Sequence, residues 1–376
     1  MKVVFTVGGY WPSAGGVQIV TKYLCEELVS RGHSVTVLTS LVDDRPREES
    51  HNGVQIIRFY EKDIFKIHTG DKGNFQNTLL EMKDEIDCLV TVCAQSFASE
   101  WMWGIMDWLP CKKVLYMHGM RSPHLNIKKI SGIKKFLKEL LLVPWWRLYF
   151  KRNWKYIIKY DSVVHLFKND TSYNYFVEKG YINNGVINNS CDDVFFDRKK
   201  TYTISEKYGI KGEYFICVAN YDSNKNQIAA YKAFVKSGVD KNLIFVGSKK
   251  NDYTKKLKSI IKHDNVKVLV GIPREDTINL IKNSYATILA SQSEYFPLTI
   301  VEGIAAGRPF ICSNVGVVPM IPGGVIVHDS NEMSYWIRFY SDNREYVEAL
   351  GKLGHEYALK NLKKDRIVDQ LERILS

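Results

Sequence analysis

The chain has 376 residues, of which 45% are hydrophobic and 25% charged, and its formal net charge is +11. That length is too great for one ordinary core and suits two domains of about 150–200 residues each. Seven cysteines lie singly without a C-x-x-C pair, which indicates reduced thiols in a cytosolic protein. The glycine-broken N-terminal stretch does not predict a signal peptide, and no apolar run is long enough to span a bilayer.

Short strands and helices are predicted to alternate along the first half of the chain. Strands are expected at residues 1–8, 34–40, 53–60, 87–93, 112–118 and 161–167, and helices at 17–30 and 77–85. The strands are rich in Val, Ile, Leu and Phe on both faces, which is typical of parallel sheets covered by helices. The first half therefore predicts a doubly wound α/β domain.

A strongly basic, aromatic segment interrupts this rhythm. Between Lys128 and Lys159 there are ten Lys or Arg residues against one acid, Glu139. Cations combined with Trp and Leu on a helix are typical of an element that lies on a membrane surface. The residues predicted to contact a membrane or acceptor are Lys134, Lys135, Lys138, Trp145, Trp146, Arg147, Lys151, Arg152 and Trp154.

Two other interpretations of this basic segment stay open. Its aromatic residues could pack into the first domain and leave a solvated basic rim, and nucleic acid is a third option that no motif supports. We favour the membrane surface, because three tryptophans within ten residues are hard to place in one small core.

The second half of the chain repeats the alternation of strands and helices more regularly. Strands are expected at 213–220, 242–247, 266–270, 286–291 and 309–313, and helices at 226–235, 253–262 and 275–283. The Asn-, Gly- and Asp-rich stretch 181–193 marks the boundary. We therefore expect domains at 1–190 and 191–355, with a C-terminal helix of about 356–376 that packs back on the first domain. Ligands would bind at the carboxyl ends of the strands, in the cleft between domains.

The stretch SEYFPLTIVEGIAAGRPF, residues 293–310, predicts a helix that starts at the end of a strand. Pro297 suits the first turn of that helix and Gly307 the position just past its end. Such a helix start attracts phosphate through its free N–H groups and partial positive charge. Glu302 lies about a turn and a half inside, and spacing alone leaves it equally open to solvent exposure or to burial with a partner.

A glycine loop follows the first strand. In GGYWPSAGGVQ, Gly15 and Gly16 would let the backbone approach a ligand closely, although a plain turn is an equal explanation. No clear D-x-D follows a strand, so the acidic pairs 43–44 and 192–193 do not predict a metal site.

The ordered motifs resemble one enzyme family. They are the glycine pair at 15–16, RGHSVTVLTS at 31–40, MHG at 117–119, NNGV at 183–186, Lys-Asn at 225–226, and E-x7-E with GRPF at 294–310. Together they resemble the retaining nucleotide-sugar glycosyltransferases of family 4, over residues 1 to about 330. The resemblance implies the GT-B fold, in which two Rossmann-like domains face each other.

The resemblance also implies roles for the E-x7-E residues. Glu302 would bind the nucleotide ribose, and Glu294 would lie beside the transferred sugar. The backbone that follows, from Phe296 to Thr299, would cradle the diphosphate. Because Pro297 has no N–H where the family commonly has glycine, these contacts would come from Leu298 and Thr299.

The remaining implied residues come from several parts of the chain. Lys225 would contact the diphosphate, whereas Asn220 stands where the family usually has an arginine. His118 would lie beside the donor sugar and acceptor, and Gly15 and Gly16 would face the diphosphate. The expected catalytic residues are thus His118, Lys225 and Glu294, and the family is independent of metals and cofactors.

The resemblance implies sugar transfer with retention from a nucleotide-diphosphate sugar, with a UDP-sugar favoured. The acceptor would be a glycan or lipid-linked glycan of bacterial cell-envelope or capsular polysaccharide, without nucleic acid as a partner. We expect a cytoplasmic protein at the inner face of the cell membrane. Two alternatives remain: a nucleotide-sugar 2-epimerase, which shares the fold, and a non-catalytic partner subunit of the same fold.

Overall fold

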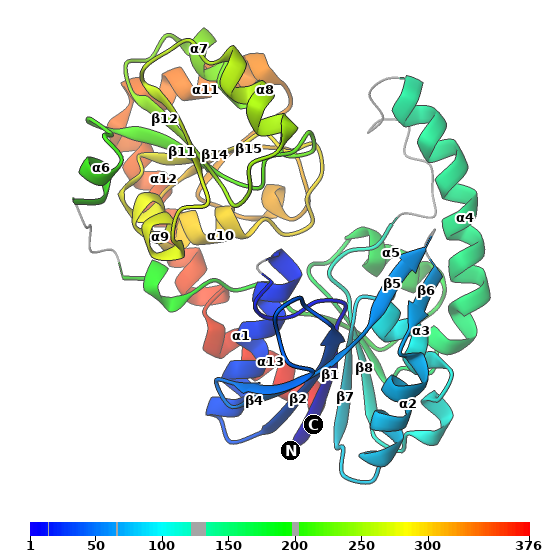
Figure 1. The fold of residues 1–376 in the computed structure, drawn as a ribbon. Coiled ribbons are helices and arrows are strands. Elements are labelled where there is room, and N and C mark those ends of the chain that lie inside the picture. The colour runs from blue at the N-terminus through cyan, green and yellow to red at the C-terminus, as the bar shows by residue number, and fades with distance from the viewer. Residues whose placement is uncertain (14, 65–66, 122–132, 198–202) are drawn as a thin grey trace. The chain divides into compact units, whose positions relative to one another are not determined.

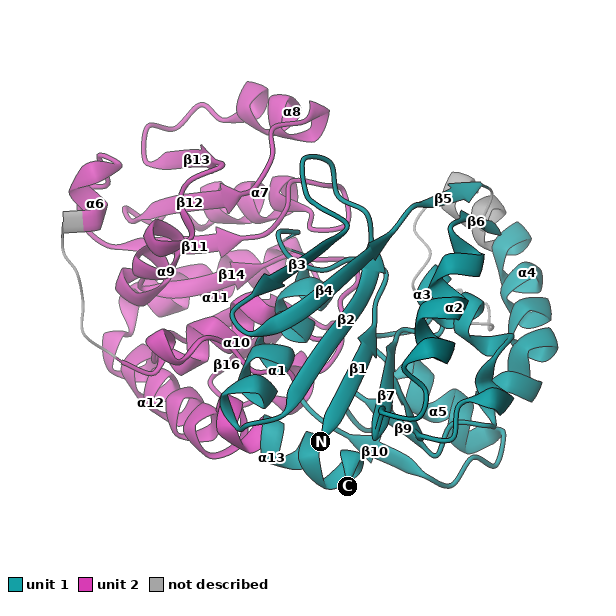
Figure 2. Cartoon of the chain, turned by 60° about the horizontal axis from the view of Figure 1, so that its bottom comes forward, with its two compact units in different colours: residues 1–188, 368–376 teal, residues 189–367 magenta. Residues whose placement is uncertain are grey.

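The protein is described here by a computed structural model that covers residues 1–13, 15–64, 67–121, 133–197 and 203–376. The chain divides into two compact units, which Figure 2 colours separately. Unit 1 consists of Met1–Asn188 and Val368–Ser376, and unit 2 consists of Asn189–Ile367. The chain therefore leaves unit 1 once and returns to it for its last residues.

Unit 1 contains an eight-stranded sheet in the order β10-β9-β8-β7-β1-β2-β4-β3. Its strands are β1 (Lys2–Thr6), β2 (Ser34–Ser40), β3 (Glu48–His51), β4 (Val54–Phe59), β7 (Cys88–Val92), β8 (Lys112–Tyr116), β9 (Ser162–His165) and β10 (Asn184–Val186). Its helices are α1 (Gly16–Ser30), α2 (Lys72–Glu81), α3 (Phe97–Trp103), α4 (Ile133–Ile157) and α5 (Thr171–Glu178). A separate hairpin pairs β5 (Glu61–Ile64) with β6 (Ile67–Gly70).

Unit 2 contains a six-stranded sheet in the order β13-β12-β11-β14-β15-β16. Its strands are β11 (Tyr214–Val218), β12 (Asn242–Gly247), β13 (Val266–Val270), β14 (Ala286–Leu289), β15 (Phe310–Ser313) and β16 (Gly324–Val327). Its helices are α6 (Thr203–Lys207), α7 (Gln227–Ser237), α8 (Asp252–Ile260), α9 (Arg274–Asn283), α10 (Leu298–Ala305), α11 (Ser330–Asp342) and α12 (Arg344–Asn361). Helices lie on both sides of this sheet, as Figure 1 shows.

Both sheets confirm the predicted doubly wound α/β architecture. Every strand pair in the described part of unit 2 is parallel. In unit 1 the order β4-β2-β1-β7-β8 reverses between β1 and β7. In unit 2 the reversal falls between β11 and β14. The four residues of β14 are all buried, because helices cover both faces of a central parallel strand.

Antiparallel pairing was not expected, and it occurs in unit 1. Strand β3 pairs antiparallel with β4 at the sheet edge, and β5 pairs antiparallel with β6. Strands β3, β5 and β6 carry polar or charged, largely exposed residues and lack the apolar runs from which the other strands, including β4, were predicted. Charged side chains on an edge strand also hinder pairing with another chain.

The C-terminal helical region is interrupted near residue 362 instead of forming one helix from about 356. Helix α12 ends at Asn361 and α13 (Lys364–Leu375) follows after a two-residue break. The Ser190 hydroxyl donates to the Leu362 carbonyl at 2.6 Å, and the Leu362 side chain is fully buried. The linker segment thus fixes the break by satisfying a carbonyl that no longer has a helical partner.

The motif RGH at 31–33 anchors α13 within unit 1. The Arg31 guanidinium contacts the carboxylates of Asp369 and Glu372, each at 2.6 Å, and His33 Nε2 lies 2.8 Å from Glu372 Oε1. Burial lowers the pKa of Arg31, but the two carboxylates outweigh that effect and raise it. This motif therefore has a structural role at the carboxyl end of α1.

Candidate active site

The loops that follow β11 and β14 meet where the strand order of unit 2 reverses. Ligands of doubly wound sheets bind at this point, beyond the carboxyl ends of the strands. Asn224 joins the two loops, because its carbonyl accepts the Gln292 N–H at 2.7 Å and its side chain donates to the Ser293 carbonyl at 2.9 Å. The two loops consequently form one connected surface.

Lys225 and Glu294 form an ion pair across these joined loops. Lys225 Nζ lies 2.6 Å from Glu294 Oε1, and their side chains are 25% and 11% exposed. The Lys225 N–H donates to Asp222 Oδ1 at 2.8 Å, and Asn226 at φ 53° precedes α7. An ammonium group held this way keeps one partner and still faces solvent, so an incoming phosphate can compete for it.

The start of α10 lies directly after this ion pair in the chain. Pro297 is the N-cap of α10, and Leu298 is the first helical residue. The proline therefore lies just before the first turn, in which the sequence predicted it. The Pro297 carbonyl accepts the N–H groups of Ile300 and Val301. The N–H groups of Leu298 and Thr299 have no intrahelical acceptor, so they remain the candidate phosphate donors.

Helix α10 is fixed at both ends. The Thr299 hydroxyl donates to the Val218 carbonyl at 2.7 Å, which ties the helix start to the end of β11. At the other end, Gly307 has φ +69°, and Arg308 N–H donates to the Gly303 carbonyl at 2.8 Å. This is a Schellman ending and confirms the predicted glycine stop.

Glu302 is buried and paired with another side chain of the protein. Of the two environments that its spacing left open, solvent exposure and burial with a partner, the structure shows the second. The Glu302 side chain is 6% exposed, and its Oε1 accepts a hydrogen bond from Arg274 of α9. Burial raises the pKa of the Glu302 carboxyl, and the charge and hydrogen bond of Arg274 reverse only part of that rise. Sequence reasoning missed Arg274, because no short motif joins residues from two different helices.

Asn220 is held by the loop that follows β12. Its Oδ1 accepts a hydrogen bond from the Ser248 hydroxyl at 2.7 Å, and its carbonyl accepts one from Gln227 at 2.9 Å. The side chain that replaces the family's arginine is therefore engaged with neutral partners. Its predicted role in donor binding stays a prediction.

Gly316 packs against the backbone of the loop that carries Glu294, and the sequence did not predict this contact. Gly316 has φ +54°, and a Cβ atom there would lie 2.2 Å from the Tyr295 carbonyl oxygen and 2.8 Å from that of Glu294. The neighbouring Val317 N–H donates to the Tyr295 carbonyl at 3.0 Å. Only glycine combines this conformation with so close a backbone approach.

His118 lies in unit 1, two residues beyond β8. Its Nε2 is buried and has no hydrogen-bond partner among the described residues, and its ring packs 4.7 Å from that of Tyr116. Burial lowers the pKa of His118 to about 4, so the imidazole is neutral at neutral pH. It can accept or donate a hydrogen bond there, but it supplies no positive charge.

The glycine pair of unit 1 opens α1. Gly15 is its N-cap, with φ −77° and ψ 165°, and Gly16 is the first helical residue. A Cβ atom on Gly16 would meet nothing within 4 Å, whereas the nearest atoms to one on Gly15 would belong to the Gln18 side chain. The protein itself therefore leaves space at Gly16, and its predicted donor contact stays a prediction.

The basic segment forms α4, which presents one apolar stripe outward. Leu141, Trp145 and Leu148 are 77%, 43% and 61% exposed. They are spaced as successive turns on one helix face. Arg147, Lys151 and Arg152 are exposed beside this stripe.

The other face of α4 packs into unit 1. Trp146 is buried and Trp154 packs against the core, with its ring centroid 5.7 Å from that of Tyr175. Two of the three tryptophans thus pack inward, although three tryptophans within ten residues were expected to be hard to place in one small core. The side chains of Lys134, Lys135 and Lys138 lie outside the described residues.

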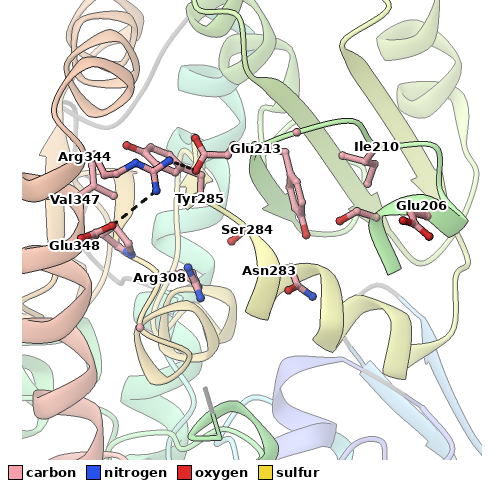
Figure 3. Close-up of a pocket in the computed structure, with 15 residues that line it drawn as sticks. Glu206, Ile210, Glu213, Asn283, Ser284, Tyr285, Arg308, Arg344, Val347 and Glu348 are labelled. Atoms are coloured by element: carbon pink, nitrogen blue, oxygen red, sulfur yellow. Dashed lines mark hydrogen bonds and ion pairs between the residues drawn. The ribbon is translucent and has the colours of Figure 1, made fainter. Parts of the chain in front are cut away.

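A cavity of about 480 Å³ lies at the amino ends of the unit 2 strands, whereas the joined loops lie at the carboxyl ends. Figure 3 shows that Glu213, Arg344 and Glu348 are linked in its wall and that Tyr285 lies beside them. These residues precede β11 and β14 or belong to α12. Because doubly wound sheets bind their ligands at the carboxyl ends, this cavity is not the candidate active site.

The described part of the chain contains neither a group of metal-binding side chains nor a helix that could cross a membrane. Across its described ranges, no three His, Cys, Asp or Glu side chains are grouped so that they could hold a metal ion. No described helix combines the length and hydropathy needed to cross a membrane. The acidic pair 192–193 is instead bound by a lysine, since Lys364 Nζ lies 3.2 Å from Asp192 Oδ1 and 3.6 Å from Asp193 Oδ2.

Known proteins resemble this chain along nearly its whole length. The chain matches a protein of Klebsiella pneumoniae described as an uncharacterized 42.6 kDa protein in the cps region, with 23% identity over 342 residues, which cover 84% of this chain and 86% of that protein. Alr3699/HepE of Anabaena, solved in complex with UDP-glucose, has a TM-score of 0.76 at 15% identity and covers 100% of this chain and 99% of its own. Sucrose-phosphate synthase of Thermosynechococcus elongatus has a TM-score of 0.74 at 15% identity and covers 99% and 98%.

Two family models divide the chain between them. The model "Glycosyltransferase Family 4" matches residues 14–165, and "Glycosyl transferases group 1" matches residues 201–361. The solved structures extend the same GT-B fold over both units. The predicted family and fold are thereby confirmed: this chain belongs to the family 4 and group 1 glycosyltransferases and is a glycosyltransferase of the GT-B fold.

Proposed function

We propose that this enzyme transfers a sugar, with retention at the anomeric carbon, from a nucleoside-diphosphate sugar to a glycan or lipid-linked glycan. The favoured donor is a UDP-sugar, and the product would belong to a capsular or other cell-envelope polysaccharide. The Klebsiella relative lies in a cps region, and Alr3699/HepE was solved with UDP-glucose, which supports both choices.

The observation that carries the proposal is the group of charges at the joined loops of unit 2. Lys225 and Glu294 are paired at 2.6 Å, and the start of α10 follows within a few residues. A cation next to free helix N–H groups suits a diphosphate, because both stabilise negative charge. Glu302, on the same helix, supplies a carboxylate that a ribose diol can approach through hydrogen bonds.

In the proposed reaction, the bond between the anomeric carbon and the diphosphate oxygen breaks and the acceptor hydroxyl forms the new bond on the same face. The diphosphate leaves with both electrons, and the acceptor proton passes to a departing phosphate oxygen. Lys225 and the N–H groups of Leu298 and Thr299 would stabilise the charge on the diphosphate, so no metal ion is required.

A thermal-shift screen with UDP-, GDP-, ADP- and dTDP-sugars tests the donor. At a hundred times its dissociation constant, a donor should stabilise the protein by about 2.7 kcal/mol, and we expect the UDP-sugars to do so. The variant Glu302→Ala should lose the shift. A full shift in that variant would disprove the ribose role, and no shift of the wild type with any donor would disprove the function.

The two alternatives separate in one assay with the donor that binds. A 2-epimerase would release an epimerised sugar nucleotide without any acceptor, whereas a transferase needs the acceptor to consume the donor productively. A non-catalytic partner subunit would bind no nucleotide. The ion pair between Lys225 and Glu294 favours the transferase over the partner subunit.

We also propose that α4 places the enzyme on an anionic membrane, at the inner face of the cell membrane. Its exposed Leu141, Trp145 and Leu148 would enter the interface, and the exposed cations beside them would attract anionic headgroups. A lipid-linked acceptor would then be concentrated where the enzyme lies. Trp146 and Trp154 take no part in this contact, because they pack inward.

Sedimentation with vesicles tests this membrane contact. The wild type should pellet with anionic vesicles at low salt and be released as salt rises, because screening weakens charge attraction. Replacing Leu141 and Leu148 by serine should weaken binding by about tenfold or more, since each leucine contributes roughly 1 kcal/mol or more when buried. The variant Leu353→Ser, at a residue 49% exposed on α12, is the control and should bind like the wild type. Wild-type protein that stays in the supernatant at low salt would disprove the contact.

A further inference from the structure

Arg274 occupies an unfavourable position for a cation. It is the first residue of α9, where the partial charge of the helix is positive, and Glu275 and Asp276 follow it. A cation at this end of a helix is repelled by the helix dipole. The position therefore needs a compensating interaction outside its own helix.

That interaction is with Glu302 and Phe195. One guanidinium nitrogen of Arg274 donates to Oε1 of Glu302, and the guanidinium carbon lies 5.5 Å from the centroid of the Phe195 ring. The Arg274 side chain is 49% exposed, whereas that of Glu302 is 6% exposed. Arg274 thus connects a buried carboxylate to the surface, and its remaining N–H groups have no acceptor among the described residues.

We propose that Arg274 is the positioning residue for the ribose site, and that Arg274 and Glu302 together select ribonucleoside over 2′-deoxyribonucleoside diphosphates. This inference rests on the proposed function, in which Glu302 binds the donor ribose. A sugar hydroxyl both donates and accepts, so a hydroxyl that donates to Glu302 can accept from Arg274. Two adjacent hydroxyls match such a pair, and the loss of one leaves a carboxylate or a guanidinium N–H unmatched.

The fixed geometry of Glu302 adds to this selection. A glutamate side chain that is already held in place loses less conformational freedom when a ligand binds. The charge and hydrogen bond of Arg274 also lower the pKa of Glu302 and so oppose part of the rise that burial causes. Two other titratable groups act on Glu302 or are acted on by it: Asp192 adds a like charge that raises the pKa of Glu302, and burial and both carboxylates raise the pKa of the Cys191 thiol. On α12, His355 Nδ1 lies 2.6 Å from the carbonyl oxygen of Ala305 on the helix that carries Glu302.

The test measures binding of UDP and 2′-deoxy-UDP by calorimetry between pH 6 and pH 8. The wild type should prefer UDP by about tenfold or more. In Arg274→Gln, UDP affinity should fall about tenfold and the preference for UDP should shrink. UDP affinity of this variant should also decline toward pH 6, because Glu302 without its cation takes up a proton more readily. Arg274→Lys should recover part of the affinity, since it keeps the charge but not the planar fork.

The control is Arg338→Gln on α11, which removes a guanidinium 55% exposed and 3.1 Å from Asp342. It should leave both affinities unchanged. Unchanged UDP affinity and unchanged preference in Arg274→Gln would overturn the inference, even if Glu302→Ala abolishes binding. An equal loss of affinity for both nucleotides, with no pH effect, would show a merely structural role and also overturn it. A wild type that binds neither nucleotide would overturn the proposed function and this inference together.

Discussion

Replacing Lys225 by alanine should lower kcat about 10²–10³-fold, because one preorganised positive group at a developing charge contributes about that much. Its ammonium lies 2.6 Å from Glu294 and is part of the surface beside the start of α10. Donor affinity should fall less than kcat, since the diphosphate gains its full charge only as the sugar departs. Steady-state kinetics with the donor identified by the binding screen measure both parameters.

A second variant separates the loss of the cation from the carboxylate that it leaves behind. In Lys225→Ala, Glu294 loses its partner while only 11% exposed, and its charge would repel the diphosphate. The double variant Lys225→Ala/Glu294→Gln removes that repulsion, so it should regain donor affinity without regaining kcat. Lys225→Arg should keep much of the activity. A kcat of Lys225→Ala within threefold of the wild type would contradict the catalytic role.

Replacing Gly316 by alanine should destabilise unit 2 by about 2–4 kcal/mol and weaken donor binding severely. The new Cβ atom would lie 2.2 Å from a backbone oxygen of Tyr295, which no side-chain rotation can relieve. The positive φ adds a further cost for any residue other than glycine. The loop that carries Glu294 must then move, and its ion pair with Lys225 is expected to break. Thermal unfolding without donor, followed by donor titration, measures both effects.

Gly73→Ala is the matched control for this variant. Gly73 lies in the first turn of α2, has no φ in the positive region, and has no atom within 4 Å of the position of a Cβ atom. The substitution should be neutral or stabilise by about 0.4–1 kcal/mol. If Gly316→Ala has the unfolding temperature and the donor affinity of the wild type, then donor binding does not depend on the contact between Gly316 and the Glu294 loop.

The stretch from residue 293 to residue 310 shows how far local sequence predicts structure. A strand, a loop and a helix ending at glycine were all predictable, because turn and capping preferences depend on neighbouring residues. Pro297 lies at the N-cap, just before the first turn in which it was predicted. The partner of Glu302 was not predictable, since Arg274 comes from another helix and their meeting depends on packing.

The basic segment shows a second limit. Its composition indicated a surface helix, and α4 does expose Leu141, Trp145 and Leu148. Counting tryptophans did not show which ones face inward. Trp154 packs against a large aromatic core that draws residues from several helices, and Trp146 packs against Tyr149 at the border of that core. The size of such a core cannot be judged from one segment.

The motif RGHSVTVLTS at 31–40 indicates the enzyme family, and its first residues have a structural role. Arg31 and His33 hold α13 through Asp369 and Glu372. A motif can thus identify a family without contacting substrate, and only coordinates separate the two cases. The antiparallel pairing of β3 with β4 and of β5 with β6 was not predicted. Such pairing satisfies backbone hydrogen bonds, and β3, β5 and β6 carry no apolar pattern that would show it in the sequence.

The return of the chain to unit 1 has a consequence for synthesis on the ribosome. Unit 2 is continuous from residue 189 to residue 367, whereas unit 1 needs residues 368–376 from the opposite end of the chain. Domains generally fold as units while the chain is being made, with the N-terminal one first. Here unit 1 is completed only after all of unit 2 has been made, and Arg31 can pair with Asp369 and Glu372 only then. A stop codon directly after residue 367 would therefore leave unit 2 whole and damage unit 1, whose synthesis began first.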